Sequence, residues 1–267
     1  MALQQITIIG AGNLGFSIAK GLISSGLIEK SSLVLTEKNP KRLVALLEEG
    51  YQAYDDNKKA VAAADLVMLV VKPWQIDEVL IDIKDIVAEK QPVLVSCVTG
   101  IMSNHIYEHL QCQPPLFRVM PNTGVAIGES MSCISEHNST AEQKEDIRNI
   151  FSQLGQVLFI PEEQMPAATA LAGCGIAFAL RFIRATIQAG VEIGFSSEDA
   201  KIMAAQITKG AAELILQNNS HPEAEIDKVT TPKGITITGL NEMEHSGFSS
   251  SIIKGLLASY NKIEQKK

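Results

Sequence analysis

"ITIIGAGNLGFSIAKGLISSG", Ile6 to Gly26, decides the fold of this chain. The β-branched run from Ile6 to Ile9 is typical of a buried strand. Helical periodicity begins directly after it, with Leu14, Ile18 and Leu22 on one face. The stretch therefore predicts a strand, a tight turn and a helix.

Three glycines in the turn, Gly10, Gly12 and Gly15, have the spacing G-x-G-x-x-G. Such glycines allow a tight turn, close approach of the backbone to a pyrophosphate, and tight packing of helix on strand. The free N–H groups at the helix start then hold the anion. We therefore expect a dinucleotide to contact Ile9, Gly10, Ala11, Gly12, Asn13, Leu14 and Gly15.

The choice of dinucleotide depends on the next predicted strand, "LVLTE", which ends at Glu37. An acid about 20 residues beyond the last glycine hydrogen-bonds the ribose and favours NAD. Lys38, Lys41 and Arg42 follow directly, and cations there favour the 2′-phosphate of NADP, although they equally suit a solvated helix start. We expect Glu37 and Lys38 to contact the cofactor, with NADPH used and NADH possible.

Strand and helix patterns keep alternating, through "LVMLVV" (Leu66 to Val71), "VLVSCV" and "LFRVM", then a helix from Ala141 to Leu154 and a closing strand "QVLFI". Continuous apolar strands fit a parallel sheet covered on both faces, and ligands of such sheets lie outside the carboxyl ends of the strands. The loops at those ends add the expected cofactor contacts Val71, Lys72, Pro73, Cys97, Val98, Thr99 and Asn122.

After Pro161 the pattern changes to helices only. We predict a long helix from Met165 to Gly194, loosened by two glycines, a second from Ser196 to Leu216, and a last one from Phe248 to Ile263. The fold class is thus α/β, with a Rossmann-type doubly wound sheet in residues 1–161 and an all-helical domain in residues 162–267.

The composition of the chain argues against several classes of function. The net charge of −7 with no basic stripe argues against nucleic acid. Four cysteines without a Cys-x-x-Cys pair indicate reduced thiols, and five scattered histidines predict no metal site. We expect no targeting signal and a cytoplasmic protein. The uncharged stretch from Gln164 to Leu180 falls short of the roughly 20 residues that cross a membrane, so it suits a buried helix or a subunit interface.

The chain resembles the pyrroline-5-carboxylate reductase family, because "IIGAGNLG", "VKP", "RVMPNTG", "TALAGCGIAF" and "VTTPKGITITGL" occur in that family's order over nearly the whole length. The resemblance implies reduction of the ring imine of 1-pyrroline-5-carboxylate to L-proline, the last step of proline biosynthesis, with hydride from NAD(P)H. It also implies that the second domain binds substrate and forms a dimer, from which higher oligomers can be built.

The resemblance further implies a substrate site in Val229–Leu240. An imino acid carries a carboxylate, which backbone N–H groups at a helix start and threonine hydroxyls can bind. Hydride transfer to an electrophilic carbon needs positioning rather than a dedicated base, and no such base is visible. By resemblance the catalytic residue Thr236 meets the ring nitrogen, and the substrate-binding residues are Thr231, Lys233, Gly234, Ile235 and Thr236.

Several positions depart from the family pattern. The family commonly has a glycine at Lys233, a small residue at Ile235, a proline at Gly124 and Ser-Gly-Ser-Gly-Pro-Ala-Tyr where this chain has "AGCGIAF". These changes leave open a reductase of a related cyclic imine or a non-catalytic dinucleotide-binding protein. A β-hydroxyacid dehydrogenase is disfavoured because no lysine stands between Pro166 and Arg181.

Overall fold

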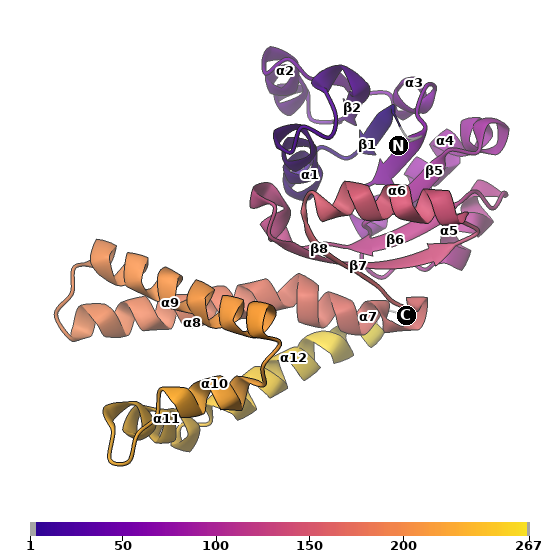
Figure 1. Cartoon of the computed structure of the whole chain (residues 1–267). Coiled ribbons are helices and arrows are strands. Elements are labelled where there is room, and N and C mark those ends of the chain that lie inside the picture. Colours follow the sequence, from indigo (N-terminus) through magenta and orange to yellow (C-terminus); the bar gives the residue numbers. More distant parts are fainter. Residues whose placement is uncertain (1–3, 266–267) are drawn as a thin grey trace. The chain divides into compact units, whose positions relative to one another are not determined.

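The computed structural model describes residues 4–265. The chain divides into two compact units, and Figure 1 colours it by sequence position. Among the described residues, one unit holds residues 4–174 and 260–265, and the other is Gly175–Ser259. The division falls after the expected boundary at Pro161, because the helical turns that follow this proline still pack on strands of the sheet. Each unit is described on its own.

The first unit is built on one sheet with the strand order β3-β2-β1-β4-β5-β6-β7-β8. Its first six strands are parallel and have the 3-2-1-4-5-6 order of the doubly wound dinucleotide-binding fold. The expected fold class is confirmed here. The strands are β1 (Ile6–Ile9), β2 (Leu33–Thr36), β3 (Gln52–Tyr54), β4 (Leu66–Leu69), β5 (Val93–Ser96), β6 (Leu116–Met120), β7 (Ser130–His137) and β8 (Gly155–Phe159).

Strand β7 runs antiparallel to β6, and β8 is parallel to β7. Strand β7 was not predicted, because its interior holds small hydroxyl residues instead of an apolar run. Ser130, Ser132 and Ser135 are nonetheless buried. The short edge strand β3 was missed too.

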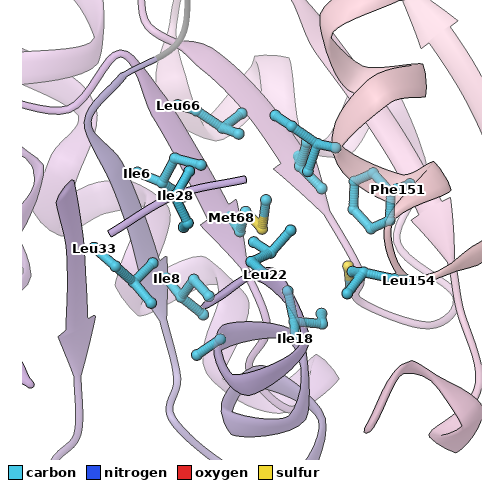
Figure 2. Packing of buried hydrophobic residues seen from close by; sticks show 14 of the residues in the cluster. Ile6, Ile8, Ile18, Leu22, Ile28, Leu33, Leu66, Met68, Phe151 and Leu154 are labelled. Atoms are coloured by element: carbon cyan, nitrogen blue, oxygen red, sulfur yellow. The ribbon is translucent and has the colours of Figure 1, made fainter. Parts of the chain in front are cut away.

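Alternate residues of the central strands point to two separate hydrophobic clusters. Ile6 and Ile8 belong to the cluster shown in Figure 2, which also holds Ile18 and Leu22 of helix α1 and Phe151 of α6. Ile9 and the apolar side chains of α4 and α5 form the second cluster. The helices of this unit are α1 (Asn13–Ser24), α2 (Pro40–Glu48), α3 (Asn57–Val61), α4 (Ile76–Lys90), α5 (Ser103–Leu110) and α6 (Ala141–Ser152).

The single long helix expected after Pro161 is interrupted. A short helix α7 (Met165–Ala168) leads into a π-helical segment, Thr169–Cys174, and only then does α8 (Gly175–Glu192) begin. The interruption coincides with the "AGCG" sequence, whose glycines weaken regular α-helical pairing. π-helical turns of this kind are frequent at functional sites.

The second unit is all helical. Helices α8 and α9 (Ser197–Asn218) pack together, and α10 (Pro222–Lys228), α11 (Ile235–His245) and α12 (Phe248–Glu264) follow. The hydroxyl of Ser196 caps α9, as expected, by accepting a hydrogen bond from the N–H of Asp199 at 3.1 Å. Phe182 meets Phe248 edge to face, with ring centroids 6.2 Å apart.

Much apolar surface of the helical segments stays exposed in the single chain. Ile202 and Ile207 of α9 are 59% and 57% exposed. The most apolar window of the helical run Glu162–Glu192 has a mean hydropathy of 1.5, and 17% of that window is buried, so the run is long and apolar enough, by length and composition only, to cross a membrane. The uncharged stretch Gln164 to Leu180, expected to be too short for a membrane span, is only part of this longer run. A subunit interface would account for the same exposed surface.

Candidate functional site

Two of the three turn glycines are required by the chain itself. Gly10 has a φ of +101°, and a Cβ there would lie 2.5 Å from the carbonyl oxygen of Val70. A Cβ on Gly15 would lie 2.1 Å from the carbonyl oxygen of Gly10. Both glycines therefore permit the tight turn and the close packing of α1 on β1.

Gly12 is different, because nothing in the chain requires a glycine there. Its φ is −64°, and a Cβ would meet no atom within 4 Å. Gly12 is the N-cap of α1, has no side chain to cap the helix, and no acidic residue stands in the first turn. The first N–H groups of α1 are thus open to an external anion. The residues present fit a dinucleotide pyrophosphate.

Glu37, Lys38 and Arg42 are already paired with one another or with a neighbour. Glu37 accepts a hydrogen bond from the N–H of Asn39 at 2.9 Å, and its other oxygen lies 3.5 Å from Nε of Arg42. Lys38 pairs with Glu78 of α4, with Nζ and Oε1 2.5 Å apart. A ribose hydroxyl would have to compete for Glu37, whereas a 2′-phosphate would offer Lys38 and Arg42 a new partner.

The other predicted cofactor residues follow neighbouring parallel strands. The registers place Ile9, Leu69 and Ser96 side by side in β1, β4 and β5, so the segments after these strands meet at one edge of the sheet. This edge brings together Ile9–Gly15, Val71–Pro73 and Cys97–Thr99, flanked by Glu37 and Lys38 after β2 and by Asn122 after β6.

Among the loop residues at this edge, side-chain access differs. Thr99 is exposed, whereas Cys97 and Val98 are buried. Burial raises the pKa of the Cys97 thiol to about 12, so it stays a neutral thiol at physiological pH. Only backbone groups of Cys97 are therefore suited to touch a cofactor.

Asn122 connects this edge to the π-helical segment. Its side-chain N–H donates to the carbonyl oxygen of Ala172 at 3.1 Å, and its side-chain oxygen accepts from the N–H of Gly124 at 2.9 Å. A Cβ on Gly124 would lie 2.4 Å from the carbonyl oxygen of Glu129. The glycine that replaces the family's proline therefore both donates to Asn122 and makes room for this carbonyl.

The predicted substrate residues lie in the second unit, around the start of α11. The N–H of Gly234 donates to the carbonyl oxygen of Thr231 at 2.8 Å, and a Cβ on Gly234 would lie 2.5 Å from Oγ1 of Thr231. Gly234 is the N-cap of α11 and leaves its first N–H groups uncapped by any side chain. Thr236, in that first turn, is exposed, and Ile235 is 93% exposed.

Lys233 adopts a left-handed conformation, with a φ of +60°. Such a conformation favours glycine and costs other residues about 1–2 kcal/mol. The lysine is exposed, as expected for a side chain directed to solvent, and within residues 4–265 no acidic partner is found for it. The loop thus keeps the backbone shape of a glycine-containing turn while carrying a cation.

The first unit also contains a buried ion pair that was not predicted from the sequence. Arg118, in β6, lies with its Nη1 2.8 Å from Oε1 of Glu162. Ser103 donates to the same carboxylate from both its N–H and its hydroxyl, at 2.8 and 2.6 Å. The arginine inside the apolar strand "LFRVM" was the signal, since a buried cation needs an anionic partner.

The fold and these sites define a class of protein, a nucleotide-dependent oxidoreductase with a Rossmann-type sheet and a separate helical unit. A family model described as pyrroline-5-carboxylate reductase dimerisation matches residues 162–266, and one described as NADP oxidoreductase coenzyme F420-dependent matches residues 5–100. The chain belongs to the pyrroline-5-carboxylate reductase family.

Relatives of this family match almost the whole chain. Pyrroline-5-carboxylate reductase 2 of Dictyostelium discoideum is 44% identical over 97% of this chain and 92% of its own length. Pyrroline-5-carboxylate reductase 1 of the same organism is 45% identical over 96% of this chain, which spans only 49% of that longer relative. The crystal structure of the Plasmodium falciparum pyrroline carboxylate reductase with NADP bound has a TM-score of 0.90 at 26% identity, covering 99% and 98% of the two chains.

Proposed function

We propose that this chain reduces 1-pyrroline-5-carboxylate to L-proline, with NADPH as hydride donor and NADH as an accepted alternative. The observation that carries the proposal is made at Gly12. The space that a Cβ on Gly12 would fill is empty, and it lies at the uncapped start of α1, where a member of this family can bind the cofactor's pyrophosphate. When bound, the reduced nicotinamide supplies a hydride for the carbon of the protonated ring imine, whose π electrons become the lone pair of the product amine.

The chain's own residues then have binding and orienting tasks. The first N–H groups of α1 hold the pyrophosphate, and the residues along the carboxyl edge of β1, β4 and β5 orient the nicotinamide. The uncapped N–H groups of α11, with Thr231 beside them, hold the substrate carboxylate. The Thr236 hydroxyl orients the ring nitrogen.

The family's dimerisation domain, matched at residues 162–266, makes this chain an oligomer. We propose a homodimer, or a higher oligomer built from dimers, which covers exposed apolar residues such as Ile202 and Ile207. Arg181 and Arg184 within α8 suit such an interface better than a bilayer. The net charge of −7 disfavours nucleic acid as a partner, and a cytoplasmic location fits this proposal.

The test is an assay of NADPH and NADH oxidation by the purified chain with 1-pyrroline-5-carboxylate, in which L-proline is quantified by chromatography. Proline formed in proportion to the cofactor oxidised supports the proposal. If neither cofactor yields proline from a dimeric protein, as judged by light scattering, the proposal is wrong.

Lys233 and Ile235 justify one further substrate in the same assay. Lys233, whose backbone is left-handed, and Ile235, which is 93% exposed, stand where the family carries smaller residues. Both side chains can therefore change the space available to the substrate ring. The six-membered ring homologue of the imino acid is the competing substrate. A higher kcat/KM for that homologue would move the assignment to the related imine.

A further inference from the structure

Two histidines and an aspartate meet on the first unit, although the sequence analysis treated the histidines as scattered. Asp77 lies in the first turn of α4, and His105 and His109 lie one turn apart on α5, which packs against α4. Oδ1 of Asp77 is 2.6 Å from Nε2 of His105 and 3.7 Å from Nε2 of His109. One potential ligand atom from each residue lies within 4.8 Å of the other two.

The orientation of His109 is fixed by its other ring nitrogen. Nδ1 of His109 lies 2.9 Å from the carbonyl oxygen of His105, which can only accept a hydrogen bond. In the neutral ring the proton therefore sits on Nδ1, and Nε2 presents its lone pair toward Asp77. This is the arrangement of metal-binding histidines, whose second nitrogen donates to a carbonyl or carboxylate.

The two rings are also held together. The imidazoles of His105 and His109 stack with centroids 4.3 Å apart and an interplanar angle of 28°. An ordinary aspartate–histidine ion pair would explain His105 alone. It leaves unexplained why a second imidazole is stacked beside it with its lone pair toward the same carboxylate.

We propose that Asp77, His105 and His109 bind a divalent first-row transition ion, with Zn²⁺ as the representative. Tetrahedral zinc with bonds near 2.0–2.1 Å has ligand atoms about 3.3 Å apart. Oδ1 of Asp77 lies 2.6 Å from Nε2 of His105 and 3.7 Å from Nε2 of His109, one distance shorter and one longer than that value. Small side-chain rotations would therefore bring the three atoms to the spacing of zinc ligands. Two imidazoles and one carboxylate suit Zn²⁺, Ni²⁺ or Cu²⁺ better than Mg²⁺ or Ca²⁺, which prefer oxygen.

The site has an open fourth position. The side chains of Asp77, His105 and His109 are 56%, 36% and 27% exposed, so water can complete the coordination sphere. Three ligands from two neighbouring helices would bridge α4 and α5, and the metal would stabilise the first unit by binding only its folded form. Exposed ligands of this kind predict a Kd in the micromolar range rather than a permanently bound ion.

The experiment is a calorimetric titration of the full chain, stripped of metal with a chelator and dialysed into a non-chelating buffer, with Zn²⁺. His105→Gln with His109→Gln removes both imidazoles while keeping helix-forming side chains. Asp77→Asn removes the charge. These variants keep all four cysteines, so any zinc bound by thiols persists in them. His245→Gln on α11 is the matched control.

The wild type and His245→Gln should bind one equivalent with the same Kd and show a higher Tm with zinc. The double-histidine variant should lose that equivalent or bind at least about tenfold more weakly. Zinc should also shift the imidazole nitrogen NMR signals of His105 and His109 and leave those of His221 unchanged. Equal zinc affinity in the wild type and the folded double variant would overturn the proposal. It would also be overturned if the wild type bound no equivalent of zinc at a free Zn²⁺ concentration about 100-fold above the expected micromolar Kd.

Discussion

Arg118 and Glu162 form a buried ion pair that fastens the end of the sheet unit to the segment leading into its last helical turns. The two side chains are 4% and 12% exposed, and Nη1 and Oε1 are 2.8 Å apart. Glu162 precedes α7, whereas Arg118 is central in β6, so one contact joins parts of the chain that are distant in sequence. His137 Nε2 lies 3.5 Å from the same carboxylate.

Glu162→Gln should destabilise the first unit strongly. The change leaves Arg118 buried beside a neutral amide, and removing one partner of a buried pair typically costs about 3–5 kcal/mol. Urea unfolding followed by circular dichroism measures the loss. Glu163→Gln, at the exposed neighbouring position, is the control and should change the free energy of unfolding by less than about 0.5 kcal/mol. Equal effects of the two substitutions would show that the pair is not stabilising.

The same pair predicts a loss of stability in acid. Burial by itself raises the pKa of Glu162, but hydrogen bonds from Ser103 and Arg118 together with the arginine's charge outweigh it and hold the pKa below 4.5. A lowered folded-state pKa means that the stability is present above the unfolded pKa and lost as the pH falls through the folded one. The difference between wild type and Glu162→Gln should therefore shrink below pH 4.5. A difference that stays constant down to full protonation would contradict this pKa.

The parts predicted from sequence were those in which one local signal sufficed. Ile6–Ile9 and the glycines after it gave the first strand and the start of α1, because the chain geometry there needs Gly10 and Gly15. Strand β7 could not be found in that way. Ser132 and Ser135 read as surface residues because serine is polar, yet the tertiary fold buries both of them.

The cluster of Asp77, His105 and His109 and the buried ion pair were unpredictable for a related reason. Asp77 and His105 are far apart in sequence, and their 2.6 Å contact depends on the packing of α4 on α5. Arg118 was visible as an anomaly in an apolar strand, but its partner Glu162 comes from beyond two further strands. Long-range side-chain contacts need the tertiary fold, whereas a glycine turn carries its own geometry.

Gly12→Val should abolish NADPH binding and leave the fold intact. A Cβ at this position would meet no atom of the chain within 4 Å, and the valine side chain would occupy the space at the start of α1 where the pyrophosphate is proposed to bind. We expect NADPH affinity to fall by at least about 100-fold, roughly 2.7 kcal/mol, in a fluorescence titration. Gly15→Val is the contrast, because its Cβ would meet the Gly10 carbonyl at 2.1 Å and should destabilise the unit itself. Unchanged NADPH affinity in Gly12→Val would remove Gly12 from the pyrophosphate site.

Lys38→Ala should weaken NADPH more than NADH. The lysine pairs with Glu78 at the surface, and a 2′-phosphate would be a doubly charged competitor for it. A loss of about 3- to 10-fold for NADPH, with NADH unchanged, is expected from a single exposed charge contact of about 1 kcal/mol. Glu78→Gln is the matched variant, since it frees Lys38 and should tighten NADPH. Equal changes for both cofactors would show that Lys38 does not contact the 2′-phosphate.

Two threonines in the first turns of α11 allow the substrate assignment to be tested within one helix. Oγ1 of Thr238 donates to the carbonyl oxygen of Gly234 at 3.1 Å, so this hydroxyl serves the helix itself. Thr236 is exposed in the turn that follows the uncapped Gly234. The two positions therefore separate a structural hydroxyl from one proposed to bind the imine.

Thr236→Val should reduce kcat/KM for 1-pyrroline-5-carboxylate by roughly 10- to 150-fold and leave NADPH affinity unchanged. Valine keeps the branched shape and removes only the hydroxyl, and a hydrogen bond to a charged group contributes about 1.5–3 kcal/mol. Thr238→Val loses the bond to Gly234 and should lower kcat/KM by less than about 3-fold. Steady-state kinetics on both variants, each checked for dimer formation, decide the matter. If Thr236→Val reduces the imine at the wild-type rate, the start of α11 is a helix cap and Thr236 does not orient the substrate.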